Sequence, residues 1–253
     1  MRSVDLNCDM GESFGAWRMG ADDAVMPHIT SANIACGFHG GDPGVMRRTV
    51  AAAKSAGVAI GAHPGLPDLV GFGRRTMDVT PAEVYDLVVY QIGALSAFAS
   101  AAGVKLQHVK PHGALYNMAA ADVELSDAIA EAVRDADRTL MLFGLAGSPM
   151  IHAGERAGLL TAQEVFADRN YMSDGSLVSR RRDDAMVTEV AEAADRALMM
   201  VREGKVRTVE DSVISIHADT ICIHGDGTHA VAFARAIRSR LEDAGIAVRA
   251  LVR

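Results

Sequence analysis

Six apolar stretches of this chain each end in side chains that can transfer protons, bind anions or hold a metal ion. In chain order these groups are Asn7, Asp9 and Glu12; His39 and Asp42; His63 and Asp68; Lys110 and His112; Asp168 and Arg169; and His224 and Asp226. Polar loop residues also follow ordinary strands, so one or two such groups would carry no meaning. Because the carboxyl ends of parallel strands converge on one face of an α/β fold, six groups predict an enzyme active site.

The first group places two carboxylates three residues apart. Asp9 and Glu12 could bind a divalent cation through oxygen, or share one proton, since neighbouring like charges resist joint ionisation. Asn7 precedes them and could contact the same ligand. The alternative is that either carboxylate only caps a loop or the segment that follows.

The next two groups contribute histidines. Glycines around His39, in the segment 36–43, let backbone and imidazole approach a ligand closely. His63 ends the third stretch, and with Asp9 the two histidines form a possible metal site that would activate water. They lie 24 residues apart and match no helical zinc motif, so the pattern favours general acid–base catalysis over metal binding.

The segment 108–117 holds the densest group of reactive side chains. The chain has 21 arginines but only four lysines, so a lysine between two histidines at a strand end indicates a need for a compact ammonium. Lys110 could neutralise a developing oxyanion or a phosphoryl oxygen, with His112 beside it as an acid or base. Strand alternation places His108 on the same face as Lys110, where an ordinary core histidine is an equal interpretation.

Two arginines could bind an anionic substrate. Arg169, next to Asp168, offers a planar fork that suits a carboxylate, although a loop salt bridge between the two explains the pair nearly as well. Arg74 lies in the glycine-rich segment 71–75, which could close on an anion.

The turn at His224, Gly225 and Asp226 precedes a predicted helix, whose amino end could bind a phosphate group. The chain carries no Walker-type phosphate-binding motif, so any nucleotide contact at this turn would be unconventional.

Composition excludes several functional classes. The chain has 253 residues, 49% of them hydrophobic, and a formal net charge of −7 with both signs interspersed, which argues against nucleic-acid and anionic-membrane partners. Cys8, Cys36 and Cys222 lie in apolar stretches and are expected to be reduced core thiols, with catalysis as the alternative for the first two. We find no segment suited to a signal peptide or a transmembrane helix, which predicts a cytoplasmic protein.

Strands and helices alternate along the whole chain. The predicted strands are 3–8, 29–36, 58–62, 105–109, 139–143, 160–166 and 213–223, with a possible last strand at 246–252. The predicted helices are 45–56, 81–102, 122–136, a short one ending at 158, 184–203 and 229–244. This order implies parallel pairing in one α/β domain, 1–253: a TIM-like barrel, irregular and seven-stranded, or alternatively an open doubly wound sheet.

Long motifs of the chain resemble those of the LamB/YcsF family, in order and over essentially the whole length. The matching segments are 5–15, 31–43, 61–65, 67–68, 71–75, 108–117, 164–171 and 222–226. Gly40 stands where alanine is expected and Ser179 where proline is expected, and neither departure removes a reactive group.

The resemblance implies an irregular (β/α) barrel of the glycoside hydrolase/deacetylase type. It also implies a role as the A subunit of an ATP-dependent 5-oxoprolinase, which converts 5-oxo-L-proline to L-glutamate with cleavage of ATP and acts with subunits B and C. ATP would be a cosubstrate, bound on this chain or on one of its partners, and a divalent metal stays possible. The competing interpretations are a stand-alone metal-dependent deacetylase or amidohydrolase, and a non-catalytic subunit that only positions its partners.

Under the 5-oxoprolinase hypothesis the reactive groups divide into roles. Asp9, with His39, His63 or His112, would activate water and protonate the departing nitrogen, while Lys110 and the 225–228 amides would hold the reacting oxygen. The residues assigned to substrate or phosphate binding are Asn7, Glu12, Arg74, Asp168, Arg169, His224, Gly225 and Asp226, and the candidate metal ligands are Asp9, His39 and His63.

Overall fold

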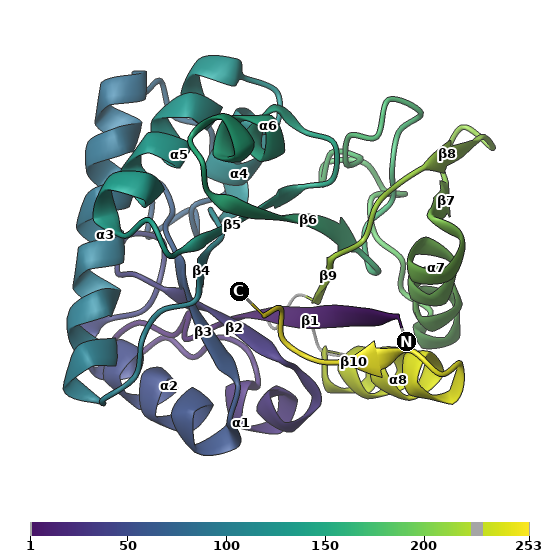
Figure 1. The fold of residues 1–253 in the computed structure, drawn as a ribbon, viewed down its shortest axis with the longest axis horizontal. Coiled ribbons are helices and arrows are strands. Elements are labelled where there is room, and N and C mark those ends of the chain that lie inside the picture. Colours follow the sequence, from purple (N-terminus) through teal and green to yellow (C-terminus); the bar gives the residue numbers. More distant parts are fainter. Residues whose placement is uncertain (1, 224–229, 253) are drawn as a thin grey trace.

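The computed structural model describes residues 2–223 and 230–252, and Figure 1 shows a ring of strands with helices around its outside. The predicted turn at His224, Gly225 and Asp226 lies outside the described residues.

Seven parallel strands form a closed barrel, which confirms the predicted TIM-like architecture. In order around the ring they are β1 (Ser3–Met10), β2 (Ser31–Ala35), β3 (Ala59–His63), β4 (His108–Val109), β5 (Met141–Leu145), β6 (Leu160–Phe166) and β9 (Thr220–Ile223). Strand β9 pairs with both β6 and β1, and this second pairing closes the ring. A short β10 (Ala247–Val248) pairs with the amino end of β1. Helices cover the outside of the barrel while side chains fill its inside, which explains why the strands are apolar runs in the sequence.

Local sequence sets the ends of the covering helices. The Asp42 side chain caps a helix by accepting the Val45 N–H at 2.9 Å, and Thr80 with Glu83 forms a complete capping box. Gly57 ends the first of these helices in the left-handed conformation, with φ of 68°. The helices are α1 (Asp22–Val25), α2 (Pro43–Ala56), α3 (Pro81–Ala101), α4 (Gly113–Ala119), α5 (Val123–Ala136), α6 (Pro149–Arg156), α7 (Val190–Glu203) and α8 (Ala230–Asp243), with a 3-10 turn at Met26–His28.

Several predicted elements have different bounds in the structure. The predicted strand 213–223 splits into β8 (Val213–Ser215), which pairs antiparallel with β7 (Lys205–Arg207), and the barrel strand β9. The chain turns at Asp219, whose carboxylate accepts the Gln163 N–H at 2.9 Å, and a continuous apolar run cannot reveal that tertiary contact. Helix α4 occupies a predicted loop. Helix α7 begins at 190 rather than 184, because Ala185 and Val187 form backbone hydrogen bonds with the segment 168–170.

Helix α3 is long and apolar enough to cross a membrane by length and composition, contrary to our expectation that no such segment exists. One face of this helix is buried in the hydrophobic core through Val84, Val88, Ile92 and Leu95. A helix that covers a barrel needs such an apolar stripe, so its composition follows from its packing.

Candidate active site

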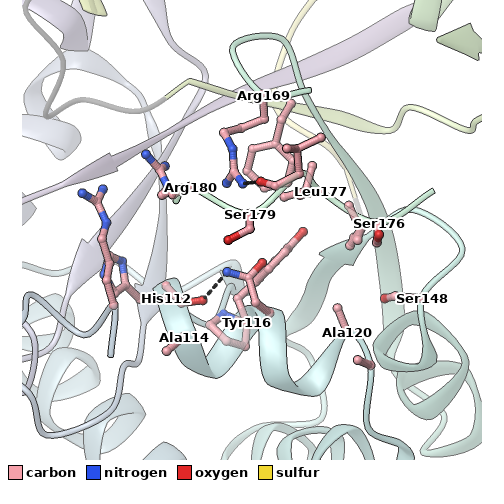
Figure 2. A pocket seen from close by; sticks show the side chains of 18 of the residues that line it. His112, Ala114, Tyr116, Ala120, Ser148, Arg169, Ser176, Leu177, Ser179 and Arg180 are labelled. Carbon is pink, nitrogen blue, oxygen red and sulfur yellow. Dashed lines mark hydrogen bonds between the residues drawn. The ribbon is translucent and has the colours of Figure 1, made fainter. Parts of the chain in front are cut away.

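A cavity of about 850 Å³ lies at the carboxyl ends of the barrel strands. Its wall includes α4, the start of α6 and the loop 174–181, as the close view in Figure 2 shows. The charged and imidazole side chains that line it are Asp9, His63, Arg74, Lys110, His112, Arg169, Asp174, Arg180 and Arg181. Six of the residues singled out in the sequence therefore share one cavity, as the strand-end pattern predicts.

Lys110 lies in a buried ionic network at the floor of this cavity. Its Nζ donates to Asp9 Oδ1 at 2.8 Å, with Glu164 Oε1 at 3.1 Å and Cys222 Sγ at 3.0 Å. Burial alone would lower the pKa of Lys110, but the neighbouring acidic groups, Asp9 foremost, hold that pKa well above its ordinary value. The ammonium therefore stays charged and compensates the buried carboxylates.

A layer of amide groups beneath Lys110 fixes this network. Asn7 Nδ2 donates to Glu164 Oε1 at 2.9 Å, and Asn33 Nδ2 donates to Asp9 Oδ1 at 2.9 Å. Asn7 is fully buried, so its place is below the cavity and its role is to hold Glu164.

His108 belongs to this lower layer. Its Nε2 donates to Asn33 Oδ1 at 2.8 Å, and its ring stacks on Phe143 with 4.1 Å between centroids. Burial lowers the pKa of His108 to about 3, so the imidazole is neutral. Of the two interpretations of this residue, the structure supports the core histidine.

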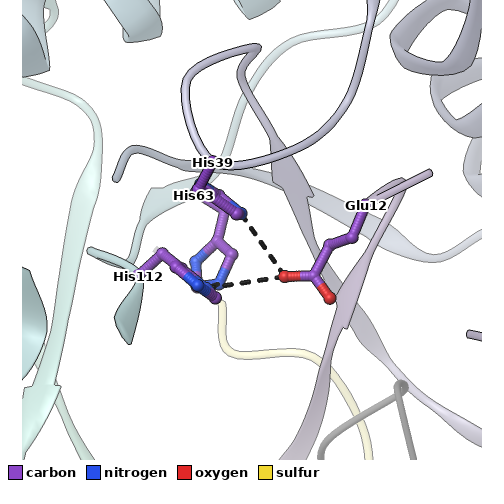
Figure 3. A group of neighbouring side chains, drawn as sticks. All are labelled: Glu12, His39, His63 and His112. Atoms are coloured by element: carbon purple, nitrogen blue, oxygen red, sulfur yellow. Dashed lines mark hydrogen bonds and ion pairs between the residues drawn. The ribbon is translucent and has the colours of Figure 1, made fainter. Parts of the chain in front are cut away.

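Three histidines and a carboxylate gather beside Asp9. Figure 3 shows Glu12 facing His39 and His112, with its Oε1 at 3.4 Å from His39 Nε2 and 3.5 Å from His112 Nδ1. The rings of His39 and His112 stack with 3.7 Å between centroids, and His63 meets both edge-on. All four side chains are buried. Burial, with help from neighbouring imidazoles, holds the pKa values of His39 and His112 well below the ordinary value.

Backbone carbonyls determine which nitrogens of this cluster face inward. His63 Nδ1 lies 2.7 Å from the Lys110 carbonyl and His112 Nε2 lies 2.8 Å from the Phe72 carbonyl. A carbonyl only accepts, so both of these nitrogens carry the hydrogen. The remaining nitrogens, His63 Nε2 and His112 Nδ1, lie 3.0 Å apart. In neutral rings both present lone pairs, an arrangement that requires a shared proton or a bound cation.

The same four residues could hold a metal ion. One ligand atom each from Glu12, His39, His63 and His112 lies within 4.8 Å of the others. Neither ring nitrogen of His39 has a hydrogen-bond partner among the described residues, as expected for a metal ligand. The carboxylate of this group is Glu12 rather than the predicted Asp9, although Asp9 Oδ2 lies 3.3 Å from His63 Nε2. Backbone carbonyls that orient imidazoles are a common second layer around metal ions.

The lack of a side chain at Gly73 allows the backbone to pack closely against His39 and His112. A Cβ atom there would meet His39 Cβ at 2.7 Å and His112 Cδ2 at 2.8 Å, and the backbone has a φ of +62° that disfavours other residues. The glycine-rich loop of the sequence thus lies directly against the histidine cluster.

The adjacent arginines of this loop have different roles. Arg75 Nε donates to Asp68 Oδ1 at 2.9 Å, which ties the loop to the end of β3, and Asp68 is buried. Arg74 lines the cavity, with its guanidinium carbon 4.8 Å from the centroid of the Phe72 ring. The prediction that Arg74 could reach an anion is therefore compatible with its position.

Arg169 lines the cavity and is 4% exposed. Its Nη2 donates to the Val178 carbonyl at 2.6 Å. Asp168 is buried next to it but is not among the cavity-lining residues. Its negative charge opposes the lowering of the Arg169 pKa that burial causes.

Sequence reasoning missed two contributors to the site. Glu164 is the one charged residue of strand β6, and a charge inside a strand was the available signal. Cys222 contacts Lys110 from across the barrel, which only the closure of the ring reveals. All three cysteines are free and buried, as expected.

The whole sequence matches one family. The LamB/YcsF family pattern covers residues 4–253. The chain belongs to the LamB/YcsF family. The A subunit of the 5-oxoprolinase of Bacillus licheniformis is 63% identical over 250 residues, which are 99% of both chains. That of Bacillus subtilis is 59% identical over 251 residues, 99% of this chain and 98% of that protein.

Solved structures agree with this family membership and with the fold type. The lactam utilization protein from Thermus thermophilus superimposes with a TM-score of 0.93 at 51% identity, over 98% of this chain and 100% of that one. At 10% identity and a TM-score of 0.52, a β-1,4-mannanase shares the fold over 96% of this chain and 99% of its own. The barrel is thus of the glycoside hydrolase/deacetylase type that the resemblance implies.

Proposed function

We propose that this chain is the A subunit of an ATP-dependent 5-oxoprolinase, which opens 5-oxo-L-proline to L-glutamate with cleavage of ATP to ADP and phosphate, together with subunits B and C. The relatives named as A subunits of 5-oxoprolinase, at 63% and 59% identity over nearly the whole chain, support this assignment. The observation that carries it is the buried Asp9–Lys110 pair, which adjoins His63 and opens into a cavity.

This arrangement suits the opening of an unactivated amide. Phosphorylation of the lactam oxygen by ATP makes the ring carbon electrophilic, and water then adds to that carbon. Asp9, hydrogen-bonded to Lys110 and 3.3 Å from His63, takes up the proton of the attacking water. Lys110 holds the oxygens of the transferred phosphoryl group, and the proton taken up by Asp9 passes to the ring nitrogen as the C–N bond breaks, which leaves an acyl phosphate of glutamate. A second water molecule then cleaves this acyl phosphate to glutamate and inorganic phosphate.

Arg74 is the residue that we assign to the substrate carboxylate. It lines the cavity on the side of the histidine cluster, where its charge acts on His39, and a guanidinium binds a carboxylate through two parallel hydrogen bonds.

A divalent cation belongs to the proposed site. Glu12, His39, His63 and His112 would hold it, and this imidazole-rich set suits zinc or a similar transition metal better than magnesium. When bound, such an ion supplies a water molecule of lowered pKa.

A stand-alone metal-dependent deacetylase or amidohydrolase is the second candidate, because the same four ligands would serve hydrolysis without ATP. Dependence on ATP separates the two functions.

The deciding experiment measures glutamate release from 5-oxo-L-proline by the chain alone and with subunits B and C, each with and without ATP. We expect release only from the complete set with ATP. Release by the chain alone without ATP, or hydrolysis of acetylated sugars by the chain alone, would contradict the proposal and favour the second candidate.

We further propose that the reaction takes place in the cytoplasm, without a nucleic-acid or membrane partner. The three buried free thiols and the absence of any disulfide among the described cysteines support a reducing compartment.

A further inference from the structure

The outer half of the cavity carries an excess of positive charge. Arg74, Arg169, Arg180 and Arg181 line it, whereas Asp174 is the single carboxylate among the described lining residues apart from Asp9 at the floor. Guanidinium groups that gather in one cavity repel each other unless an anion lies between them.

Arg169 is the most unusual member of this group, because it is a cation that is almost completely buried. Beyond its bond to the Val178 carbonyl, its Nε has no hydrogen-bond partner among the described residues. Burial, and then the charge of Arg180, lower the pKa of Arg169 to about 10. Figure 2 shows both side chains on the same wall of the cavity.

Three consecutive arginines on this wall have different surroundings. Arg180 and Arg181 line the cavity, but Arg182 does not. Arg182 instead pairs with Asp184, its Nη2 at 2.6 Å from Asp184 Oδ2 and its Nε at 2.9 Å from Oδ1. Arg182 thus lies outside the cavity and is paired with an acid, whereas Arg180 and Arg181 line the cavity.

Backbone hydrogen bonds hold this wall in place. The Val178 N–H donates to the Asn170 carbonyl at 2.9 Å, and the Val187 N–H donates to the Asp168 carbonyl at 2.9 Å. The backbone of this wall is therefore held in place before any ligand binds, which reduces the entropy lost on binding.

We propose that Arg169, Arg180 and Arg181 form a subsite for a phosphoryl group, distinct from the position at Arg74. Three guanidinium groups exceed what one carboxylate needs, and their planar forks match the oxygens of a tetrahedral dianion. The cavity of about 850 Å³ has room for such a group beside a five-membered lactam. The subsite shares its cavity with the proposed 5-oxoprolinase reaction and so rests on that function.

The test is calorimetric titration of the full chain with inorganic pyrophosphate, with succinate at equal ionic strength as the carboxylate control. We expect the double variant Arg180→Ala/Arg181→Ala to bind pyrophosphate about tenfold more weakly or worse, because charge-assisted hydrogen bonds are lost. The control Arg182→Ala should stay within about twofold of the wild type, since an exposed ion pair contributes little. Arg169→Lys keeps the charge but loses the planar guanidinium that can donate two parallel hydrogen bonds. This variant should bind pyrophosphate more weakly while its melting temperature stays that of the wild type.

Three results would overturn the subsite: unchanged binding by the double variant, an equal loss in Arg182→Ala, or succinate binding as tight as that of pyrophosphate. Titration with ATP identifies the source of the phosphoryl group. ATP that binds more tightly than pyrophosphate indicates a nucleotide, and equal or weaker binding of ATP indicates a phosphorylated lactam. Because these titrations need no turnover, lack of pyrophosphate binding in a chain that supports 5-oxoproline turnover contradicts the subsite alone, and binding without turnover contradicts the proposed function alone.

Discussion

At the amino end of the barrel, Asp5 is fully buried and accepts hydrogen bonds from the hydroxyl groups of Thr30, Ser31 and Thr220 at 2.7, 2.6 and 2.6 Å. At the carboxyl end, Asp9 is also buried, but it lies between an ammonium and an imidazole and lines a cavity. Two carboxylates four residues apart on one strand thus have different surroundings.

The comparison separates stability from chemistry. Burial raises the pKa of Asp5, the three hydroxyl groups oppose that rise, and neither Asp5 nor any of the three residues that donate these hydroxyl groups lines the cavity. Asp9 contacts Lys110 and His63, which can exchange protons with it, and it lines a cavity that a ligand can enter. In a barrel with parallel strands the loops that bind ligands follow the carboxyl ends, so only the second position can meet a substrate.

The substitution Asp9→Asn tests this comparison most severely. We expect turnover of 5-oxo-L-proline by the complex with subunits B and C to fall by about 10²–10⁴-fold, because the amide can no longer accept a proton. The matched variant Asp5→Asn should retain the turnover of the wild type per folded molecule. Equal turnover in the two variants would contradict the division between the barrel ends.

Removing one imidazole tests whether the carboxyl-end cluster is a metal site. His39→Asn should weaken zinc or manganese binding by at least about 100-fold, more than loss of an outer partner causes. Equilibrium dialysis with metal analysis measures this directly. The control is His152→Asn, which replaces an exposed histidine whose Nδ1 lies 3.5 Å from Glu155 Oε2. If both variants bind metal like the wild type, the cluster shares a proton instead.

A substitution at the amino end of the barrel should change the stability of the protein rather than its activity. Asp5→Asn replaces one acceptor oxygen with a donor against hydroxyl groups, and we expect the free energy of unfolding to fall by about 1–3 kcal/mol. Urea denaturation followed by circular dichroism measures the loss. A variant as stable as the wild type would show that the hydroxyl network contributes nothing.

The neutral His108 between the two ends predicts a pH dependence of stability. Its pKa is about 3 in the folded chain, against about 6.5 when unfolded, so below pH 6.5 only the unfolded chain takes up the proton. The contribution of the neutral His108 to the free energy of unfolding is complete above about pH 6.5. Below that pH the contribution falls by about 1.4 kcal/mol per pH unit.

His108→Gln, which keeps a donor toward Asn33, should remove this contribution. Between pH 6 and pH 5 the wild type should lose about 1 kcal/mol more of its unfolding free energy than the variant does. Parallel losses in urea titrations of the two proteins would show that His108 is not held neutral.

Particular residues show how far the sequence predicts this molecule. The apolar stretches and the capping box at Thr80 predicted most barrel strands and the start of α3, because these depend on neighbouring residues. The prediction of one strand over 213–223 was wrong, because this segment is divided by contacts of Asp219 with the distant strand β6. Helix α4 was missed because its amino end has no side-chain cap.

The sequence by itself determined that reactive side chains would follow the strands, and hence that Asp9, His63 and Lys110 would meet at one end of a barrel. Only the tertiary structure decided which groups pair: Asp9 with Lys110 from 101 residues away, Glu12 with the histidines, and Arg180 and Arg181 but not Arg182 with the cavity. The physical reason is that local spacing sets the end of a strand on which a side chain lies. Its partners depend on the register and closure of strands that are far apart in the chain.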